Sequence, residues 1–239
     1  MKTSYILLIA LATMVVSCKE EKETPKVIYD STKSVKPEPP KVDTTRVVIA
    51  DLPIEISGTN YLIHPIGDIR VYDAARNRYS GNSGRNVSYT ISNYNEFEIT
   101  GYLSNLKFQP IGSDSLHVLS SKPVLIQTAT FLRQAPAKSS QQLMVYTLAD
   151  MDTNKDGRLD ENDIKSLYIS TISGDKFTKL SVDFEELVDW QLAVNSNRVY
   201  FRTIEDTNKN GEFDKDDVVH YHYIDLADAD WTVKSYKPV

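Results

Sequence analysis

The chain contains 239 residues, carries a formal net charge of −6 at pH 7 and has a single cysteine, Cys18. The acidic charge argues against nucleic acid as a partner, because phosphate binding requires a basic surface. The single cysteine excludes an intramolecular disulfide, so the folded state has to depend on its apolar core and on any bound metal.

Residues 1–17 have the pattern of a secretory signal peptide. Lys2 is followed by an uncharged apolar run over residues 5–16. This run is shorter than the about 20 residues that a membrane-spanning helix needs, and it has the length of a signal-peptide core. It ends in Val15-Val16-Ser17-Cys18, which resembles the lipobox of bacterial lipoproteins. The resemblance implies that Cys18 is acylated, becomes the first residue of the mature chain and anchors it in a membrane.

Residues 18–50 follow as a lipidated tether that we expect to be disordered. The tripeptide Lys19-Glu20-Glu21 resembles the surface-export signal of Bacteroidota lipoproteins. This implies an outer-membrane protein on the cell surface, with the periplasmic face as the alternative. The tether is rich in proline and charge and holds few large apolar residues. Such a composition buries too little apolar surface to offset the entropy of ordering, so it predicts an extended spacer.

From residue 51 to residue 239 the sequence predicts one all-β domain built from antiparallel sheets. Short runs alternate polar with apolar or aromatic residues, as in 68–72, 87–91 and 198–202, and turn residues separate them. Alternation with a period of two, together with many β-branched and aromatic residues, is typical of half-buried strands.

Residues 143–181 and 197–235 form an internal repeat with an offset of 54 positions. Ungapped superposition gives 11 identities in 39 positions, and seven of them lie inside a twelve-residue acidic loop. Each unit is predicted to contain a strand, the loop, a second strand, a short turn and a final strand. The repeat resembles a β-propeller blade with a calcium loop inserted between neighbouring strands, which implies a propeller-like fold. An antiparallel β-sandwich is the alternative.

The two acidic loops span residues 152–163 and 206–217, and we name them the first and the second loop. Position 6 is glycine in both, which permits a sharp bend. Calcium takes roughly six to eight oxygen ligands, and a tight turn brings alternate side chains to one centre. Oxygen-bearing side chains stand at positions 1, 3, 5, 9 and 12: Asp152, Asn154, Asp156, Asp160 and Asp163 in the first loop, and Asp206, Asn208, Asn210, Asp214 and Asp217 in the second.

This pattern resembles the EF-hand calcium loop. The resemblance implies two bound Ca²⁺ ions, with the backbone carbonyls of Arg158 and Glu212 as the ligands at position 7. Both loops end in Asp instead of the usual Glu, and their flanks are predicted strands instead of helices. We therefore expect calcium to stabilise loops between strands. The first loop, with four carboxylates, should bind more tightly than the second, with three.

The leading functional hypothesis is a non-catalytic binding or structural module, whose ligand would be a glycan or a protein. A glycan-processing hydrolase or accessory protein is the alternative, because carboxylates such as Glu185 and Asp189 are plentiful. No residue is assigned a catalytic role. His220 and His222 alternate along a predicted strand without further ligands at a recognisable spacing, so we interpret them as surface or core histidines.

Overall fold

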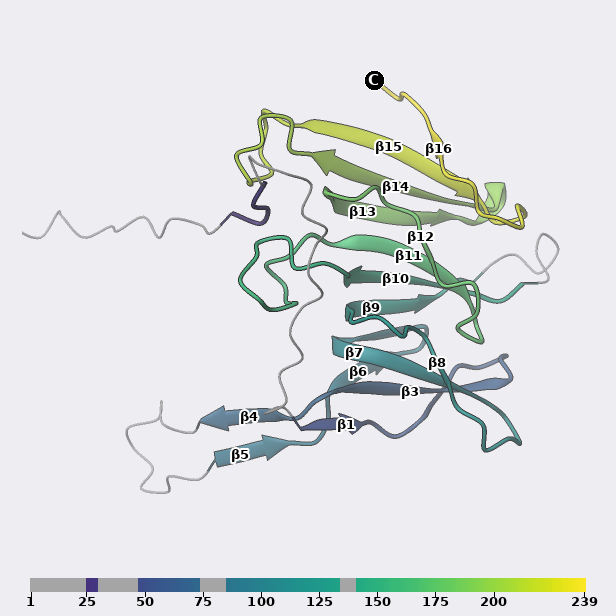
Figure 1. The fold of residues 1–239 in the computed structure, drawn as a ribbon. Coiled ribbons are helices and arrows are strands. Elements are labelled where there is room, and N and C mark those ends of the chain that lie inside the picture. The colour runs from purple at the N-terminus through teal and green to yellow at the C-terminus, as the bar shows by residue number, and fades with distance from the viewer. Residues whose placement is uncertain (1–24, 30–46, 74–84, 134–140) are drawn as a thin grey trace, which may run out of the picture.

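The computed structural model of the chain describes residues 25–29, 47–73, 85–133 and 141–239 (Figure 1). The predicted signal peptide, Cys18 and the Lys19-Glu20-Glu21 tripeptide lie outside the described residues. Within the described ranges, no helix has the length and apolar character needed to cross a membrane.

The described residues form sixteen β-strands and a short 3-10 helix, η3 (Val194–Ser196), so the prediction of an all-β fold is confirmed. The strands before residue 140 are β1 (Val48–Ala50), β2 (Ile54–Glu55), β3 (Tyr61–Asp68), β4 (Arg70–Asp73), β5 (Arg85–Ser88), β6 (Ser92–Asn95), β7 (Glu98–Pro110), β8 (His117–Val118) and β9 (Leu125–Phe131). Those after it are β10 (Leu143–Ala149), β11 (Ser166–Thr171), β12 (Thr178–Lys179), β13 (Glu185–Ala193), β14 (Arg198–Glu205), β15 (Val218–Asp225) and β16 (Lys234–Ser235).

The strands pair antiparallel in two larger sheets and one hairpin (Figure 1). The large sheet follows the order β1-β3-β7-β9-β10-β11-β12, with β2 beside β3 and with β6 and β8 beside β7. The small sheet has the order β13-β14-β15-β16, and β4 pairs with β5. Both larger sheets run open from one edge strand to the other, which agrees with the sandwich alternative. A ring of propeller blades is not shown among the described strands.

One apolar cluster joins the two larger sheets. It combines Val145 of β10 and Ile169 of β11 with Val199 and Phe201 of β14. These side chains are at most 2% exposed, and burying a large apolar side chain contributes about 1.5–3 kcal/mol. A second cluster, around Phe108, fills the N-terminal part of the large sheet. The two sheets are therefore held together through strands that flank the acidic loops.

The sequence repeat is also a repeat of structure. Strands β10, β11 and β12 pair in chain order, and so do β14, β15 and β16. Tyr146 lies opposite Tyr168 in the first unit, as Tyr200 lies opposite Tyr223 in the second. Each unit thus carries its acidic loop at the same place, between its first and second strands.

Part of the predicted tether belongs to the folded body. Residues 25–29, which we name the strap, pack against both acidic loops, and Val27 in the strap is 2% exposed. Strand β1 also begins at Val48, ahead of the expected domain boundary at residue 51. The expectation of disorder throughout 18–50 does not hold for these residues. One buried valine and a few backbone hydrogen bonds order a segment that composition alone leaves unstructured.

Candidate functional site

Both acidic loops lie at the same end of the sheets (Figure 1). The first loop connects β10 with β11, and the second connects β14 with β15. Since these four strands meet in the shared apolar cluster, the fold brings together two loops that are 54 residues apart in the chain.

In the first loop, the carboxylates at positions 1 and 12 hold the turn closed. Asp152 accepts hydrogen bonds from the backbone amides of Asp156 at 3.2 Å and Gly157 at 2.9 Å. Asp163 accepts one from the amide of Thr153 at 2.7 Å, which ties the end of the loop to its beginning. These carboxylates therefore determine the bend of the backbone as well as the charge of the loop.

The second loop repeats this network position for position. Asp206 accepts hydrogen bonds from the amides of Asn210 at 3.2 Å and Gly211 at 2.7 Å, and Asp217 accepts one from Thr207 at 3.1 Å. The glycine at position 6 has φ of +84° in both loops, and the lysine at position 4 has φ of +57° and +58°. The two loops therefore share one backbone conformation.

The other predicted ligands also occupy equivalent places. Each side chain at position 3, 5 or 9 accepts a hydrogen bond from the amide two residues later, which is the Asx-turn geometry that folds a chain locally. They are Asn154, Asp156 and Asp160 in the first loop, and Asn208, Asn210 and Asp214 in the second. Arg158 and Glu212 follow the two glycines directly, at the position expected to offer a backbone carbonyl.

Asp163 is the most buried carboxylate of the first loop, with 1% exposure. Burial raises the pKa of its carboxyl group, because a low-dielectric surrounding disfavours the charged form. Hydrogen bonds from the amides of Asp160 and Thr153 act in the opposite direction, since they favour the carboxylate. A cation bound to this loop would act in the same direction as these amides.

Within the described part of the chain, one group of side chains meets the geometric requirement for a metal site. Glu185, Glu205 and His220 each offer one ligand atom, and the three atoms lie within 4.8 Å of one another. The carboxylates of the acidic loops do not form such a group. The structure therefore presents one candidate group and not two. The prediction of two calcium sites therefore depends on the conformation of the loops and on the type of ligand atom that they offer.

The register of the small sheet assembles this group. Glu185 in β13 lies directly opposite Glu205 in β14. In β15, Nε2 of His220 lies 2.9 Å from Oε2 of Glu205. The three residues come from three strands and have no local spacing in common, so no sequence motif marks them. Only the alternation of His220 with His222 could have drawn attention to this face.

The strap is hydrogen-bonded to both loops. The amide of Lys26 donates to the carbonyl of Gly211 at 2.8 Å, and the amide of Ile28 donates to the carbonyl of Thr153 at 2.9 Å. The hydroxyl of Thr153 donates in turn to the carbonyl of Lys26 at 2.8 Å. The ammonium group of Lys26 also lies 3.0 Å from Glu186. Five residues near the N-terminus thus connect the loop of the large sheet with that of the small sheet.

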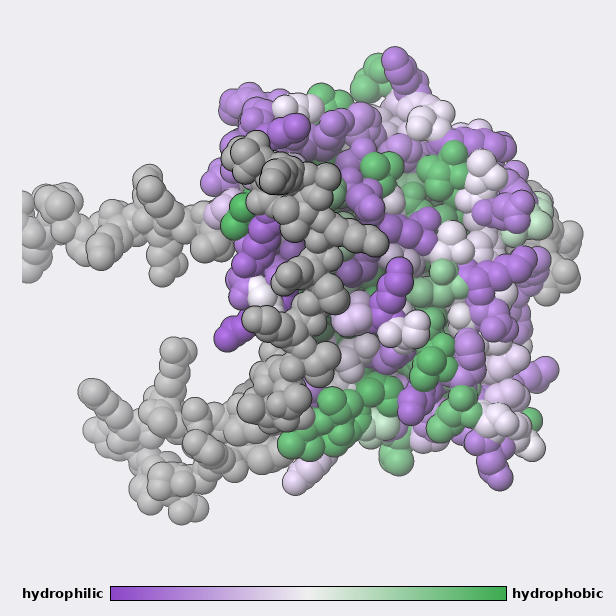
Figure 2. All heavy atoms as spheres, viewed as in Figure 1, coloured by the Kyte–Doolittle hydropathy of each residue, from purple (hydrophilic) through white to green (hydrophobic). Residues whose placement is uncertain are grey.

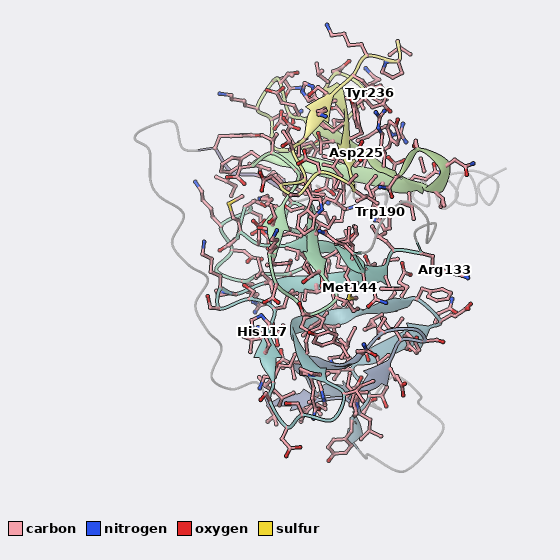
Figure 3. The ribbon with its side chains drawn as sticks, turned by 90° about the vertical axis from the view of Figure 1, so that its right-hand side faces the viewer. His117, Arg133, Met144, Trp190, Asp225 and Tyr236 are labelled. Atoms are coloured by element: carbon pink, nitrogen blue, oxygen red, sulfur yellow. The ribbon has the colours of Figure 1, made fainter. Side chains whose placement is uncertain are left out.

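A group of tyrosines lies on the small sheet. The ring of Tyr236 is 5.5 Å from that of Tyr200, 5.8 Å from that of Tyr221 and 6.1 Å from that of Tyr223. All four side chains are half-buried. Figure 3 shows Tyr236 at the end of the molecule that the small sheet forms. The rings line part of the surface there.

The chain matches no protein-family model, and no curated protein or solved structure is significantly similar to it. The features that bear on its function are the loops, the strap and the polar and aromatic groups of the small sheet.

Proposed function

We propose that the chain is a calcium-binding surface protein, anchored through a lipid on Cys18, that serves as a non-catalytic binding or structural module. The observation that supports this most strongly is the shared conformation of the two acidic loops, whose sequences differ at five of twelve positions. Both loops keep oxygen donors at the same five positions despite these differences. A common backbone with a common donor set supports a common ligand.

The donor set fits calcium better than a softer metal. Every predicted side-chain ligand is a carboxylate or an amide oxygen, and calcium selects oxygen ligands in flexible geometry. The first loop would hold the ion through side chains at positions 1, 3, 5, 9 and 12 and the carbonyl of Arg158, and the second through the equivalent groups with Glu212. When bound, the ion neutralises carboxylates that a tight turn brings close together.

The strap bears on which end of the domain would face the membrane. Pro25 follows Cys18 by seven residues, and seven extended residues reach at most about 25 Å. A lipid on Cys18 would therefore hold the loop end of the domain close to the outer membrane, at the cell surface in our proposal. The opposite strand ends would point away from it. A Cys18→Ala variant should then disappear from the membrane fraction.

The tyrosine group is the candidate binding surface, and a glycan is the ligand class that fits it best. Tyrosine rings offer apolar faces together with hydroxyl groups, which suits a partner that is both apolar and polar. Over the described residues of the face in Figure 2, apolar side chains stand in separate groups among hydrophilic ones.

One observation supports the hydrolase as a second candidate. Glu185 and Glu205 bring carboxylate oxygens within 4.8 Å of each other, and paired carboxylates carry out glycoside hydrolysis. Hydrolysis of polysaccharides by the wild type that is lost in a Glu185→Gln variant would support this candidate over the binding module.

The calcium proposal is tested by thermal unfolding of the chain from residue 19 onward, in chelator and in millimolar calcium. An ion that binds only the folded state should stabilise it by about 2.7 kcal/mol per site at a hundredfold excess over its Kd. Asp152→Ala should lose more of the calcium-dependent rise in Tm than Asp206→Ala, because the first loop has more carboxylates.

Asp230→Ala is the matched control for these two variants. Asp230 is an exposed carboxylate in a turn outside both loops, so its removal should keep the full calcium-dependent rise. An unchanged Tm of the wild type in calcium would contradict the proposal. Equal losses in Asp152→Ala and Asp206→Ala would contradict only the ranking of the two loops.

A further inference from the structure

The end of the small sheet next to the second loop carries a set of polar side chains on one face. Thr203 and Glu205 alternate along β14, and His220 and His222 alternate along β15. Glu185 joins them from β13 through its pairing with Glu205. Thr203 and His222 are buried, with 0% and 7% exposure. A sheet face that is apolar further along its strands therefore becomes polar and partly buried here.

Two carboxylates face each other within this set. Like charges directly opposite each other in an antiparallel pair destabilise a sheet, and Glu185 and Glu205 are such a pair. The side chain of Glu185 is only 13% exposed and that of Glu205 is 51% exposed, so water screens the charge of Glu185 less well than that of Glu205. The hydroxyl of Thr203 donates a hydrogen bond to Glu185, but it carries no charge. A positive charge between the two carboxylates would offset this repulsion.

We propose that Glu185, Glu205 and His220 bind a divalent transition-metal ion of the zinc class, at a site separate from the two calcium loops. An imidazole nitrogen combined with carboxylate oxygens is typical of zinc and related ions, whereas calcium and magnesium select oxygen alone. The three ligand atoms already lie within 4.8 Å of one another. Glu205 and His220 have partly exposed side chains that can rotate to complete the contacts.

His222 offers a further imidazole nitrogen close to Glu185. Its Nε2 lies 4.0 Å from Oε2 of Glu185, while its Nδ1 lies 3.3 Å from the hydroxyl of Ser235. Its ring stacks on Phe201 with 5.0 Å between centroids, which fixes its orientation. Histidines that ligate a metal usually have their second nitrogen held by a hydrogen bond in this way. His222 is therefore placed to support Glu185 or to complete the shell as a fourth ligand.

A proton on His220 is the competing source of positive charge, and metal titration separates the two. The whole chain from residue 19 is stripped with chelator, supplied with excess calcium and titrated with zinc against a chromophoric competitor. We expect one zinc equivalent to bind. Cobalt at the same site should give visible d–d absorption bands of a nitrogen- and oxygen-ligated ion.

Glu205→Gln and His220→Gln should each weaken zinc binding by more than about tenfold, because each removes a ligand. His117→Gln is the matched control. Nε2 of His117 lies 3.6 Å from Oδ1 of Asp175, and within the described ranges these two residues belong to no group of three potential metal ligands. Figure 3 shows His117 well apart from Tyr236 of the small sheet. Zinc affinity should be unchanged in this variant.

The proposal is overturned if the wild type binds no stoichiometric zinc, since a proton would then suffice. It is also overturned if His117→Gln weakens binding as much as His220→Gln. Thermal unfolding without metal checks that each variant is folded. An Asp152→Ala variant should keep full zinc affinity, so a failure of the calcium loops and a failure of the zinc site give different results.

Discussion

The two acidic loops share one backbone conformation, yet different positions are buried in each loop. At position 2, Thr153 of the first loop is 2% exposed, whereas Thr207 of the second is exposed. At position 6 the order is reversed, with Gly157 exposed and Gly211 buried. A local sequence pattern therefore sets the backbone shape of a loop, whereas the segments that pack against the loop decide which of its residues are buried.

The strap is the neighbour that makes this difference. It lies on position 2 of the first loop and on position 6 of the second. A Cβ atom added to Gly211 would be 2.3 Å from the carbonyl oxygen of Val27, whereas one added to Gly157 would have nothing within 4 Å. Burial, followed by the charge of Asp206, raises the pKa of the Tyr29 hydroxyl in the strap. The strap therefore fits the second loop tightly at a place where the first loop is open.

The largest expected effect comes from replacing the two glycines with alanine. Both have φ of +84°, so each replacement costs about 1–2 kcal/mol for a left-handed conformation with a Cβ atom. Gly211→Ala should lower the free energy of unfolding more than Gly157→Ala, because it also displaces the strap. Urea denaturation measures the free energy of unfolding of both variants. Gly58→Ala, with the same φ and nothing within 4 Å, is the control, and equal losses at Gly157 and Gly211 would contradict the role of the strap.

A smaller loss of stability is expected when two neighbouring strap residues are replaced with alanine. Val27 is 2% exposed and Ile28 is 43% exposed. Val27→Ala should cost about 1.6 kcal/mol, because it removes two buried carbons at about 0.8 kcal/mol each. Ile28→Ala should stay within about 0.5 kcal/mol. Urea denaturation gives both values, and hydrogen exchange of the Ile28 amide should become faster in Val27→Ala. A larger loss in Ile28→Ala would mean that the strap is not anchored by its valine.

The smallest expected change in stability concerns the ion pair of Asp189 and Arg202. This pair lies outside both loops and so serves as a reference for the comparison of the two loops. The hydrogen bond from Arg202, followed by its charge, lowers the pKa of Asp189 below its ordinary value of 3.8. A carboxyl group with a lowered pKa contributes stability above its unfolded pKa and loses it as the pH falls through the folded one. Because the pair is exposed, the contribution is small.

An Asp189→Asn variant should therefore show a slightly smaller loss of Tm than the wild type between about pH 5 and about pH 3, the range in which an aspartate gains its proton. Thermal unfolding across this range measures it. The same difference should appear in a Gly211→Ala background, because Asp189 pairs with Arg202, which belongs to neither the strap nor a loop. A difference that depends on Gly211 would show that the strap acts further into the small sheet.

Features with local causes could be predicted from the sequence. Alternating side chains along a strand and turn residues at its ends are set within a few positions, so the all-β fold was predictable. Asx side chains and glycine bend the chain within five residues, so both acidic loops were predictable with their equivalent positions. The lipid anchor on Cys18 stays a prediction, because it lies outside the described residues.

Features that join distant residues became visible only in the folded chain. The strap has the composition of a spacer, and it is ordered because Val27 and Lys26 meet loops that lie more than 120 residues away. The group of Glu185, Glu205 and His220 exists because strand register sets three unrelated segments side by side. Register depends on which apolar faces are buried together, and that is a property of the whole core. No spacing of residues within the sequence indicates this register.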